Sequence, residues 1–173
     1  RDIDVLQRAV VTELIFTNVF KGMDAGQIAA LLSCFVYGDG GGSKDKDDTP
    51  RLRTELEQPY RLLRDSAKRV AKVMEENEAL EDMSVEEYVD SFDPGLMEIV
   101  YEWVNGKKFF EICKLNKKIY EGTIIRCMRR LEELIAELKK ATKVVGDDML
   151  REKFEQCSTK IRRDIIFAAS LYL

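Results

Sequence analysis

Histidine is absent from this sequence of 173 residues. Histidine is the side chain that enzymes use most often as a general base, and it is a frequent zinc ligand, so its absence removes the usual routes to both kinds of site. The four cysteines lie far apart and form no Cys-x-x-Cys pair. We therefore expect reduced, buried thiols, no metal site and no catalytic residue in this chain. The cysteines are Cys34, Cys113, Cys127 and Cys157.

Long apolar runs are missing as well. No stretch of about 20 apolar residues is present to cross a bilayer, and no signal peptide is found. We therefore expect an intracellular protein with no membrane partner. The first residue is Arg1 rather than methionine, which indicates a fragment of a longer protein.

The alternation typical of β-strands does not occur, whereas apolar residues recur at helical spacing along most of the chain. The sequence therefore predicts an all-α fold, a bundle of about seven or eight helices that includes one long helix. The length fits a single domain over residues 1–173.

Several helix ends are marked by their local signals. A first helix is expected from Asp4 to Phe20. Asp24 and Gln27 form a capping-box pattern before a helix that is apolar nearly all round and should be buried. Thr49-Pro50 predicts the start of a helix that Pro59 kinks or divides. Later helices are expected after Ser84, from Asp93 to Gly106, around 107–115, from Glu121 to Val145, and from Leu150 to Tyr172.

A glycine-rich segment, residues 38–49, predicts a flexible exposed loop within the domain. Phosphate-binding loops need glycines at fixed spacings, and both common patterns fail here because Ser43 stands where a glycine is required. We therefore expect no nucleotide site in this loop.

Charge is unevenly distributed along the chain, although the net charge is only −4. Residues 75–102 contain eleven acidic and no basic residues, and residues 103–143 contain eleven basic and five acidic ones. The basic segment either binds a polyanion or attracts the acidic segment within the fold.

Three arginines lie near the start of the long helix predicted over residues 121–145. With about 100° per residue, Arg126 points almost directly away from the apolar seam. Arg129 points to one flank, beside Glu132 and Glu133, which predicts surface ion pairs. The seam consists of Ile124, Met128, Leu131, Ile135 and Leu138.

Arg130 lies on the other flank, at the edge of the apolar stripe and between Cys127 and Leu134. An arginine in such a place can lay its aliphatic stem on apolar surface and direct its guanidinium into a groove, where it can stack on a base or bind a phosphate. The alternative is an ion pair with Glu133 or Glu137.

The basic turn before this helix, with Lys114, Lys117 and Lys118, also permits a helix-turn-helix interpretation. A recognition helix exposes the polar face of its first turns to DNA, whereas this helix carries a core seam through more than five turns. The seam therefore argues against DNA recognition.

Seven segments in order resemble the C-terminal helical (DSHCT) domain of DExH-box RNA helicases, closest to the exosome-associated helicase of the nuclear TRAMP complex. The likeness extends from about Thr12 to Leu173. The segments are "TELIF", "ALLSCFVY", "YVDSF", "LMEIVYEW", "FFEICKL", "YEGTIIRCMRRLEEL" and "RRDIIFAASLYL".

The resemblance implies that the bundle closes over RecA-like motor domains and that its long ratchet helix contacts single-stranded RNA. In the family the basic residue before "LEEL" contacts RNA, which is Arg130 here, and Arg126 lies on the same helix. The family's acidic contact residue falls at Asp39, in a longer and more glycine-rich segment than relatives have. The resemblance thus implies three RNA-binding residues: Arg130, Arg126 and Asp39.

The same resemblance implies the wider role. The parent protein would be an ATP-dependent 3′-to-5′ RNA helicase that feeds RNA to the nuclear exosome with adaptor proteins, and ATP and Mg²⁺ would bind its motor domains. This chain has no ATP motif, so we expect no cofactor and no ATP hydrolysis in it. The alternative is a helical protein-interaction scaffold without nucleic-acid contact.

Overall fold

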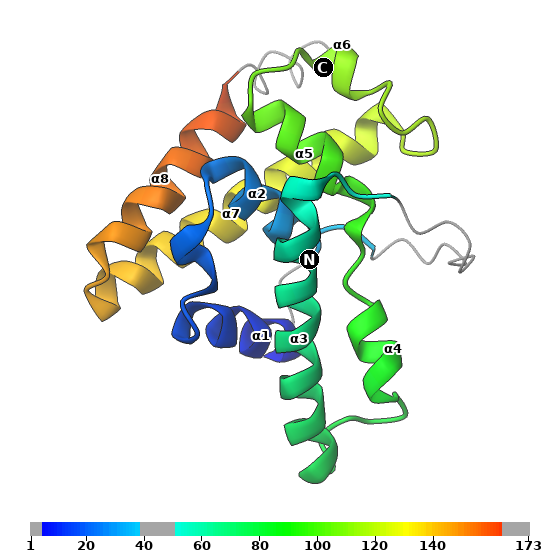
Figure 1. Ribbon diagram of the computed structural model, residues 1–173, viewed down its shortest axis with the longest axis vertical. Coiled ribbons are helices and arrows are strands. Elements are labelled where there is room, and N and C mark those ends of the chain that lie inside the picture. Colours follow the sequence, from blue (N-terminus) through cyan, green and yellow to red (C-terminus); the bar gives the residue numbers. More distant parts are fainter. Residues whose placement is uncertain (1–4, 39–50, 164–173) are drawn as a thin grey trace.

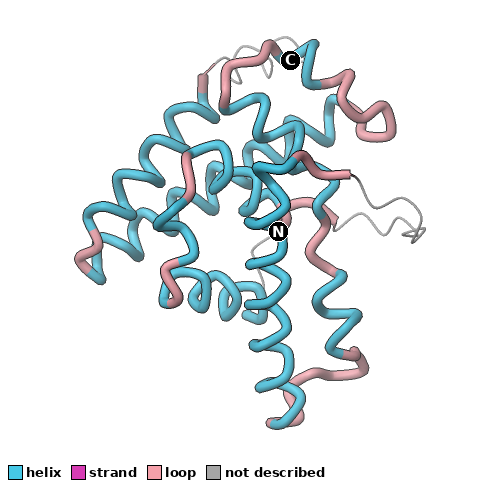
Figure 2. The backbone as a smooth tube through the Cα atoms, in the orientation of Figure 1, coloured by secondary structure: helices cyan, strands magenta, loops and turns pink. Residues whose placement is uncertain are grey.

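The computed structural model of the chain describes residues 5–38 and 51–163. These residues form helices joined by turns and contain no strand (Figures 1 and 2), which confirms the predicted all-α class. Every helix in this part of the chain is too short or too polar to cross a bilayer. In chain order the elements are α1 (Val5–Phe16), the 3₁₀ helix η1 (Val19–Gly22), α2 (Ala25–Ser33), α3 (Thr54–Glu76), α4 (Val85–Asp90), the 3₁₀ helix η3 (Pro94–Leu96), α5 (Met97–Val104), α6 (Phe109–Ile112), α7 (Glu121–Val145) and α8 (Asp148–Arg162).

Helix α2 lies in the middle of the bundle (Figure 1), in contact with α3, α5, α7 and α8. All of its residues except Gln27 are buried, which confirms the burial predicted from its apolar sequence. Gly26 allows α5 to approach closely, because a Cβ at this position would lie 3.1 Å from the Tyr101 ring and 3.2 Å from the Asn105 amide. The other helices are therefore packed around α2.

Gln27 joins the start of α2 to α3. The predicted capping box is present: Gln27 N–H donates to Asp24 Oδ1 at 2.8 Å, and Asp24 N–H donates to Gln27 Oε1 at 2.9 Å. The Gln27 amide also donates to the Glu55 carbonyl at 3.0 Å. That carbonyl has no helical partner, because the residue four positions later is Pro59, which lacks an N–H. Gln27 thus supplies the missing hydrogen bond, and α3 continues through Pro59 without being divided.

The predicted start of α3 was wrong. Thr49 and Pro50 lie outside the described residues, and the helix begins only at Thr54. Arg53 is extended, with ψ 160°, and its N–H donates to Glu98 Oε1 at 2.7 Å. This bond to α5 holds the backbone out of the helical conformation until the next residue.

The predicted first helix is also shorter than expected. α1 ends at Phe16, and Asn18 adopts a left-handed conformation with φ 57° before η1 begins. The ammonium of Lys153, on α8, donates to the carbonyls of Phe20 at 3.1 Å and Met23 at 3.0 Å. Because a distant lysine binds the carbonyls that end η1, the turn is stabilised by a contact that local sequence does not show. The last helix is shorter than predicted as well, because α8 ends at Arg162 and Arg163 is no longer helical; the predicted end, Tyr172, lies outside the described residues.

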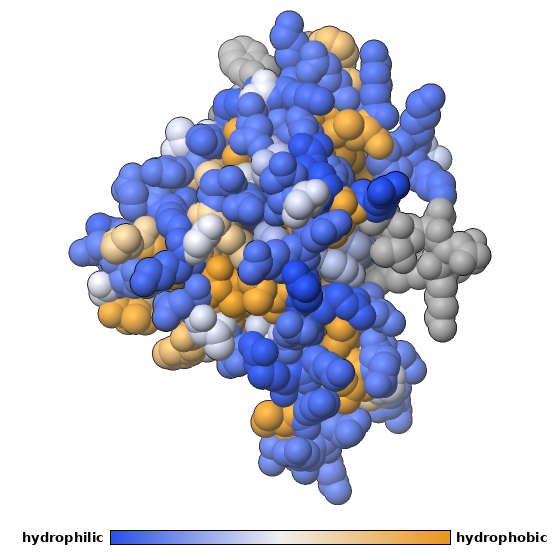
Figure 3. All heavy atoms as spheres, viewed as in Figure 1, coloured by the Kyte–Doolittle hydropathy of each residue, from blue (hydrophilic) through white to orange (hydrophobic). Residues whose placement is uncertain are grey.

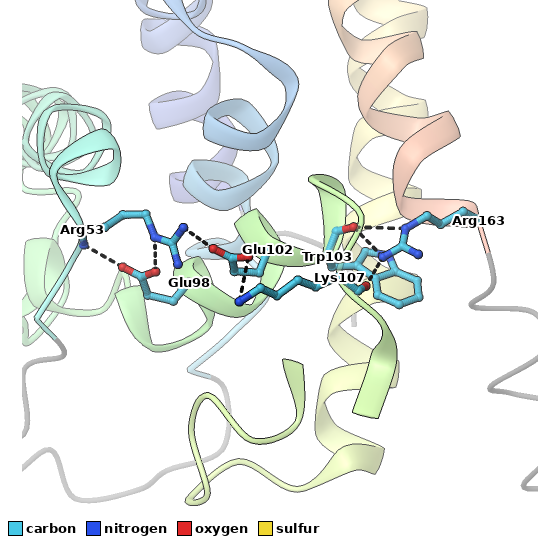
Figure 4. Close-up of polar contacts among 6 residues, drawn as sticks. All are labelled: Arg53, Glu98, Glu102, Trp103, Lys107 and Arg163. Atoms are coloured by element: carbon cyan, nitrogen blue, oxygen red, sulfur yellow. Dashed lines mark hydrogen bonds and ion pairs between the residues drawn. The ribbon is translucent and has the colours of Figure 1, made fainter. Parts of the chain in front are cut away.

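An ion-pair network joins the start of α3 to α5 (Figure 4). The Arg53 guanidinium binds the carboxylates of Glu98 and Glu102 and lies 4.8 Å from the centre of the Tyr101 ring. Glu102 also pairs with Lys107 at 3.4 Å, and its side chain is only 12% exposed. Charge-assisted hydrogen bonds of this kind are stronger than neutral ones, so the network fixes α3 against α5.

A second set of contacts joins the end of α8 to α5. The Arg163 guanidinium stacks 3.8 Å from the centre of the Trp103 ring and donates to the carbonyls of Trp103 and Lys107 (Figure 4). The Trp103 indole N–H in turn donates to the Ile161 carbonyl at 2.9 Å. A buried tryptophan with its N–H satisfied anchors both helices.

The four cysteines are free thiols, as expected, and all but the half-buried Cys113 are buried. Cys157 lies at the contact between α8 and α2, where its thiol donates to the Ala25 carbonyl at 3.4 Å. Burial raises the pKa of Cys157 to about 12.

We predict that Gln27→Ala lowers the free energy of unfolding by about 1–3 kcal/mol, because it leaves the Glu55 carbonyl and the Asp24 N–H without their partner. Gln27→Glu keeps the oxygen that accepts from the Asp24 N–H but removes the amide that donates to the Glu55 carbonyl. This variant therefore measures the bond to Glu55 alone. Urea unfolding gives both values. Pro59→Ala, which restores an N–H for the Glu55 carbonyl, should reduce the cost of Gln27→Ala. Additive effects of the two substitutions would contradict this coupling.

Glu102 should make stability depend on pH. Burial alone would raise its pKa, but the hydrogen bond from Arg53 and the contact with Lys107 lower the pKa below its ordinary value. Its contribution is therefore fully present above the ordinary pKa of a glutamate and is lost as pH falls through the lowered pKa of the folded state.

We predict that Glu102→Gln costs about 1–3 kcal/mol of unfolding free energy at pH 7 and that the difference from wild type shrinks below about pH 4. Urea unfolding at a series of pH values measures this. Glu155→Gln, which removes an exposed carboxylate paired with Lys139, is the control and should show a much smaller difference. A difference for Glu102→Gln that stays constant down to pH 3 would contradict the assignment.

Candidate nucleic-acid interface

Helix α7 is the long helix predicted from sequence. It passes beside α2 and α8 (Figure 1), and all five residues of its predicted seam are buried. It ends at Gly146, whose φ of 83° suits a glycine after a helix. Arg126 and Arg129 are exposed, and Arg130 is half-buried. The seam therefore fixes which faces of α7 its arginines occupy.

Arg130 reaches the end of the α2 segment. Its Nη1 donates to the Val36 carbonyl at 3.3 Å, and the Cys127 thiol approaches the same oxygen at 3.7 Å. This backbone contact is neither of the two alternatives that the sequence suggested, because it involves no ligand and neither Glu133 nor Glu137. It places the guanidinium at the boundary between α7 and the turn after α2.

The turn after α2 is fixed by its neighbours. A Cβ on Gly38, whose φ is +112°, would lie 3.2 Å from the Cβ of Asp93. The Tyr37 ring is half-buried, and its pKa is raised by burial and then by the nearby Asp93 and Cys127. The turn up to Gly38 therefore has a defined position close to Arg130. Asp39, the predicted acidic contact, is the next residue and lies outside the described residues.

The two exposed arginines differ from Arg130 in their contacts. Arg126 Nη2 donates to the Thr123 hydroxyl at 3.3 Å, one turn earlier on the same helix. The prediction that Arg129 pairs with Glu132 and Glu133 was wrong, because neither ion pair forms among the described residues and Glu132 instead pairs with Arg162 of α8 at 2.8 Å. The packing of α8 beside α7 supplied a partner that the spacing within α7 could not reveal.

The charged segments pair with several neighbours. The Lys107–Glu102 pair joins the basic segment to the acidic one, which supports internal attraction as one of the two interpretations. Asp90 of the acidic segment, however, pairs with Arg64 of α3 at 3.0 Å, and Arg64 lies outside the basic segment. Among the described residues no group of three metal-binding side chains is arranged to hold an ion.

Val36 is the part of the site that sequence reasoning missed. Its contribution is a backbone carbonyl, and every residue has one, so no residue type or spacing could have indicated it. The apolar run of α2 indicated burial but not which carbonyl would face α7.

The structure is an all-helical bundle around one buried helix, α2, and the long helix α7 carries arginines at the edge of its buried face. Residues 2–168 match the family model described as the DSHCT (NUC185) domain. The chain therefore belongs to the DSHCT domain family, as the resemblance predicted.

Several curated relatives are RNA helicases by name. The chain is 44% identical over 164 residues to the "ATP-dependent RNA helicase mtr4" of Schizosaccharomyces pombe, which covers 95% of this chain and 14% of that protein. It is 43% identical over 172 residues to the human "Exosome RNA helicase MTR4", covering 99% of this chain and 16% of that protein. It is 38% identical over 163 residues to the human "Superkiller complex protein 2", covering 94% of this chain and 12% of that protein. The chain is thus a DSHCT module of the kind found in RNA helicases and spans about a seventh of their length.

Gly95 positions the turn that adjoins Arg130. A Cβ at this residue would lie 2.6 Å from Cε1 of Tyr37 and 3.1 Å from Oδ1 of Asp93. We predict that Gly95→Ala lowers the free energy of unfolding by about 1–3 kcal/mol, because the Tyr37 ring must move. Gly122→Ala is the matched control, since open space surrounds Gly122 in α7 and alanine there favours the helix. Equal urea midpoints for the two variants would refute the clash.

Proposed function

We propose that this chain is the RNA-channel module of an ATP-dependent 3′-to-5′ RNA helicase, with α7 as the ratchet helix that contacts single-stranded RNA. Family membership and the names of its relatives support this proposal. Under this proposal, RecA-like motor domains elsewhere in the protein bind ATP and Mg²⁺, and the bundle closes over them. This module then contributes RNA contacts and no catalytic group.

The observation that carries the proposal is the position of Arg130. Arg130 is half-buried and its guanidinium donates to the Val36 carbonyl, so the group is held in one place rather than free in solvent. A planar guanidinium that is already held in place can stack on a base or bind a phosphate while losing little conformational entropy. Arg126 lies one turn earlier and close to the same face of α7. The two arginines would then contact successive parts of one strand.

The proposal extends to the process that the RNA enters. Because one relative is named as an exosome RNA helicase, we place this module in a nuclear helicase that passes unwound RNA to the exosome together with adaptor proteins. Asp39, next to the fixed turn, is the proposed acidic contact to the same RNA.

We predict that Arg130→Ala in the full-length protein removes an RNA contact worth about 1–3 kcal/mol, measured as weaker RNA binding or slower unwinding. The same change removes the hydrogen bond to Val36, so the free energy of unfolding should fall by about 1 kcal/mol. Arg130→Lys keeps the charge but not the planar donor group, and it should recover only part of the RNA contact.

Arg129→Ala is the matched control, because Arg129 shares the helix and the charge but is exposed on the opposite flank. Equal defects from Arg129→Ala and Arg130→Ala would show that only general positive charge matters. Unaltered unwinding in both would remove α7 from the RNA path and favour a helical scaffold for protein partners instead.

A further inference from the structure

Helix α6 and the turn that leads to α7 expose aromatic rings. Of the ten large hydrophobic side chains that the described residues expose, three lie within eleven residues here: Phe110 at 58%, Leu115 at 42% and Tyr120 at 80% exposed. In Figure 3, hydrophobic atoms lie among hydrophilic ones over the end of the molecule that carries α6. We call Phe110, Lys114, Leu115, Lys117 and Tyr120 the corner patch.

The backbone under the corner patch is anchored. Ile112 and Ile119 are buried, and the Phe109 ring packs edge-on against Trp103 with 6.1 Å between ring centres. Asn116 Oδ1 accepts from the N–H of Lys118 at 3.1 Å and shapes the turn. The exposed rings are therefore carried by a fixed backbone, Phe110 on α6 and Tyr120 at the end of the turn.

A cation lies beside one of these rings, and lysines are frequent in the segment. The Lys114 ammonium lies 5.4 Å from the centre of the Phe110 ring, and Lys117 is exposed on the following turn. Residues 107–120 contain five lysines and a single acidic residue, Glu111. The corner patch therefore complements a negatively charged partner with flat apolar groups.

We propose that the corner patch binds single-stranded RNA, with bases stacked on Tyr120 and Phe110 and phosphates bound by Lys114 and Lys117. Sites for single strands combine aromatic stacking with a positively charged track for the backbone. Protein–protein interfaces, in contrast, are depleted in lysine relative to the rest of the surface. The composition thus favours a nucleic acid over a protein partner.

The corner patch continues into the contact proposed for α7, and this inference rests on that proposed function. Tyr120 is the N-cap of α7, and Arg130 follows ten residues later, about 15 Å along the helix axis. A single strand of a few nucleotides is long enough to span that distance. The corner patch would hold one part of the strand while Arg130 and Arg126 hold the next.

The test measures binding of a fluorescein-labelled oligouridylate to the full-length protein by anisotropy. Tyr120→Ala and Phe110→Ala should each weaken binding by about fivefold or more, because each removes a stacking surface. Tyr120→Phe keeps the ring and should bind like wild type. Lys117→Ala should reduce the slope of log Kd against log salt by about 0.7, the value for one phosphate contact on a single strand.

Two control variants test whether the loss of binding is specific to the corner patch. Lys143→Ala removes the same charge from the opposite end of α7, and Met149→Ala removes an exposed apolar side chain there. Neither should change Kd. Urea unfolding checks that Tyr120→Ala is folded, which its exposed ring predicts. Ultraviolet crosslinking of the bound oligouridylate, mapped by mass spectrometry, should identify Tyr120 or Phe110.

The outcomes separate this inference from the proposed function. Defects from Arg130→Ala alone, with no crosslink in the corner patch, would overturn the corner patch and leave the function of α7 standing. Defects from Tyr120→Ala and Phe110→Ala alone would support the corner patch and remove Arg130 from the RNA path. Unchanged RNA binding in all of these variants, with crosslinks elsewhere, would overturn both. Weakened binding of a protein partner with RNA binding intact would show that the corner patch is a protein interface and would also overturn it.

Discussion

The burial of α2 is the constraint on which the rest of this structure depends. Because every residue of α2 except Gln27 is buried, the surrounding helices must cover it on all sides. Gln27, the one residue at its surface, completes the hydrogen bonds of α3 at Pro59. At its other end the chain turns at Val36, which meets α7. A single apolar segment thus sets the positions of both the scaffold and the candidate site.

The direction of the α7 arginines depends on keeping α7 in a fixed rotation about its own axis. Its buried seam sets that rotation, since turning the helix would expose leucine and isoleucine side chains and bury arginines. The contact between Arg130 and the Val36 carbonyl sets the same rotation from the polar side. The packing energy of the core and the direction of the α7 arginines are therefore linked, and a core substitution under α7 can turn these arginines without contacting them.

Local signals predicted much of this fold, because helix periodicity, capping boxes and terminal glycines act over a few residues. The misses share one physical cause, which is a partner far away in sequence. The break after α1 is stabilised by Lys153, and the late start of α3 by the bond between Arg53 and Glu98. At the candidate site, the flank of α7 that carries Arg130 followed from the seam, but its acceptor did not.

Cys157 gives this molecule an internal reporter of its own opening. The thiolate, not the thiol, reacts with alkylating agents, and a pKa of about 12 leaves almost none of it at neutral pH while α8 stays packed on α2. Reaction must therefore wait until the two helices separate. The rate at which this sulfur is alkylated measures how often the central helix is uncovered, a local opening free energy that global unfolding does not resolve.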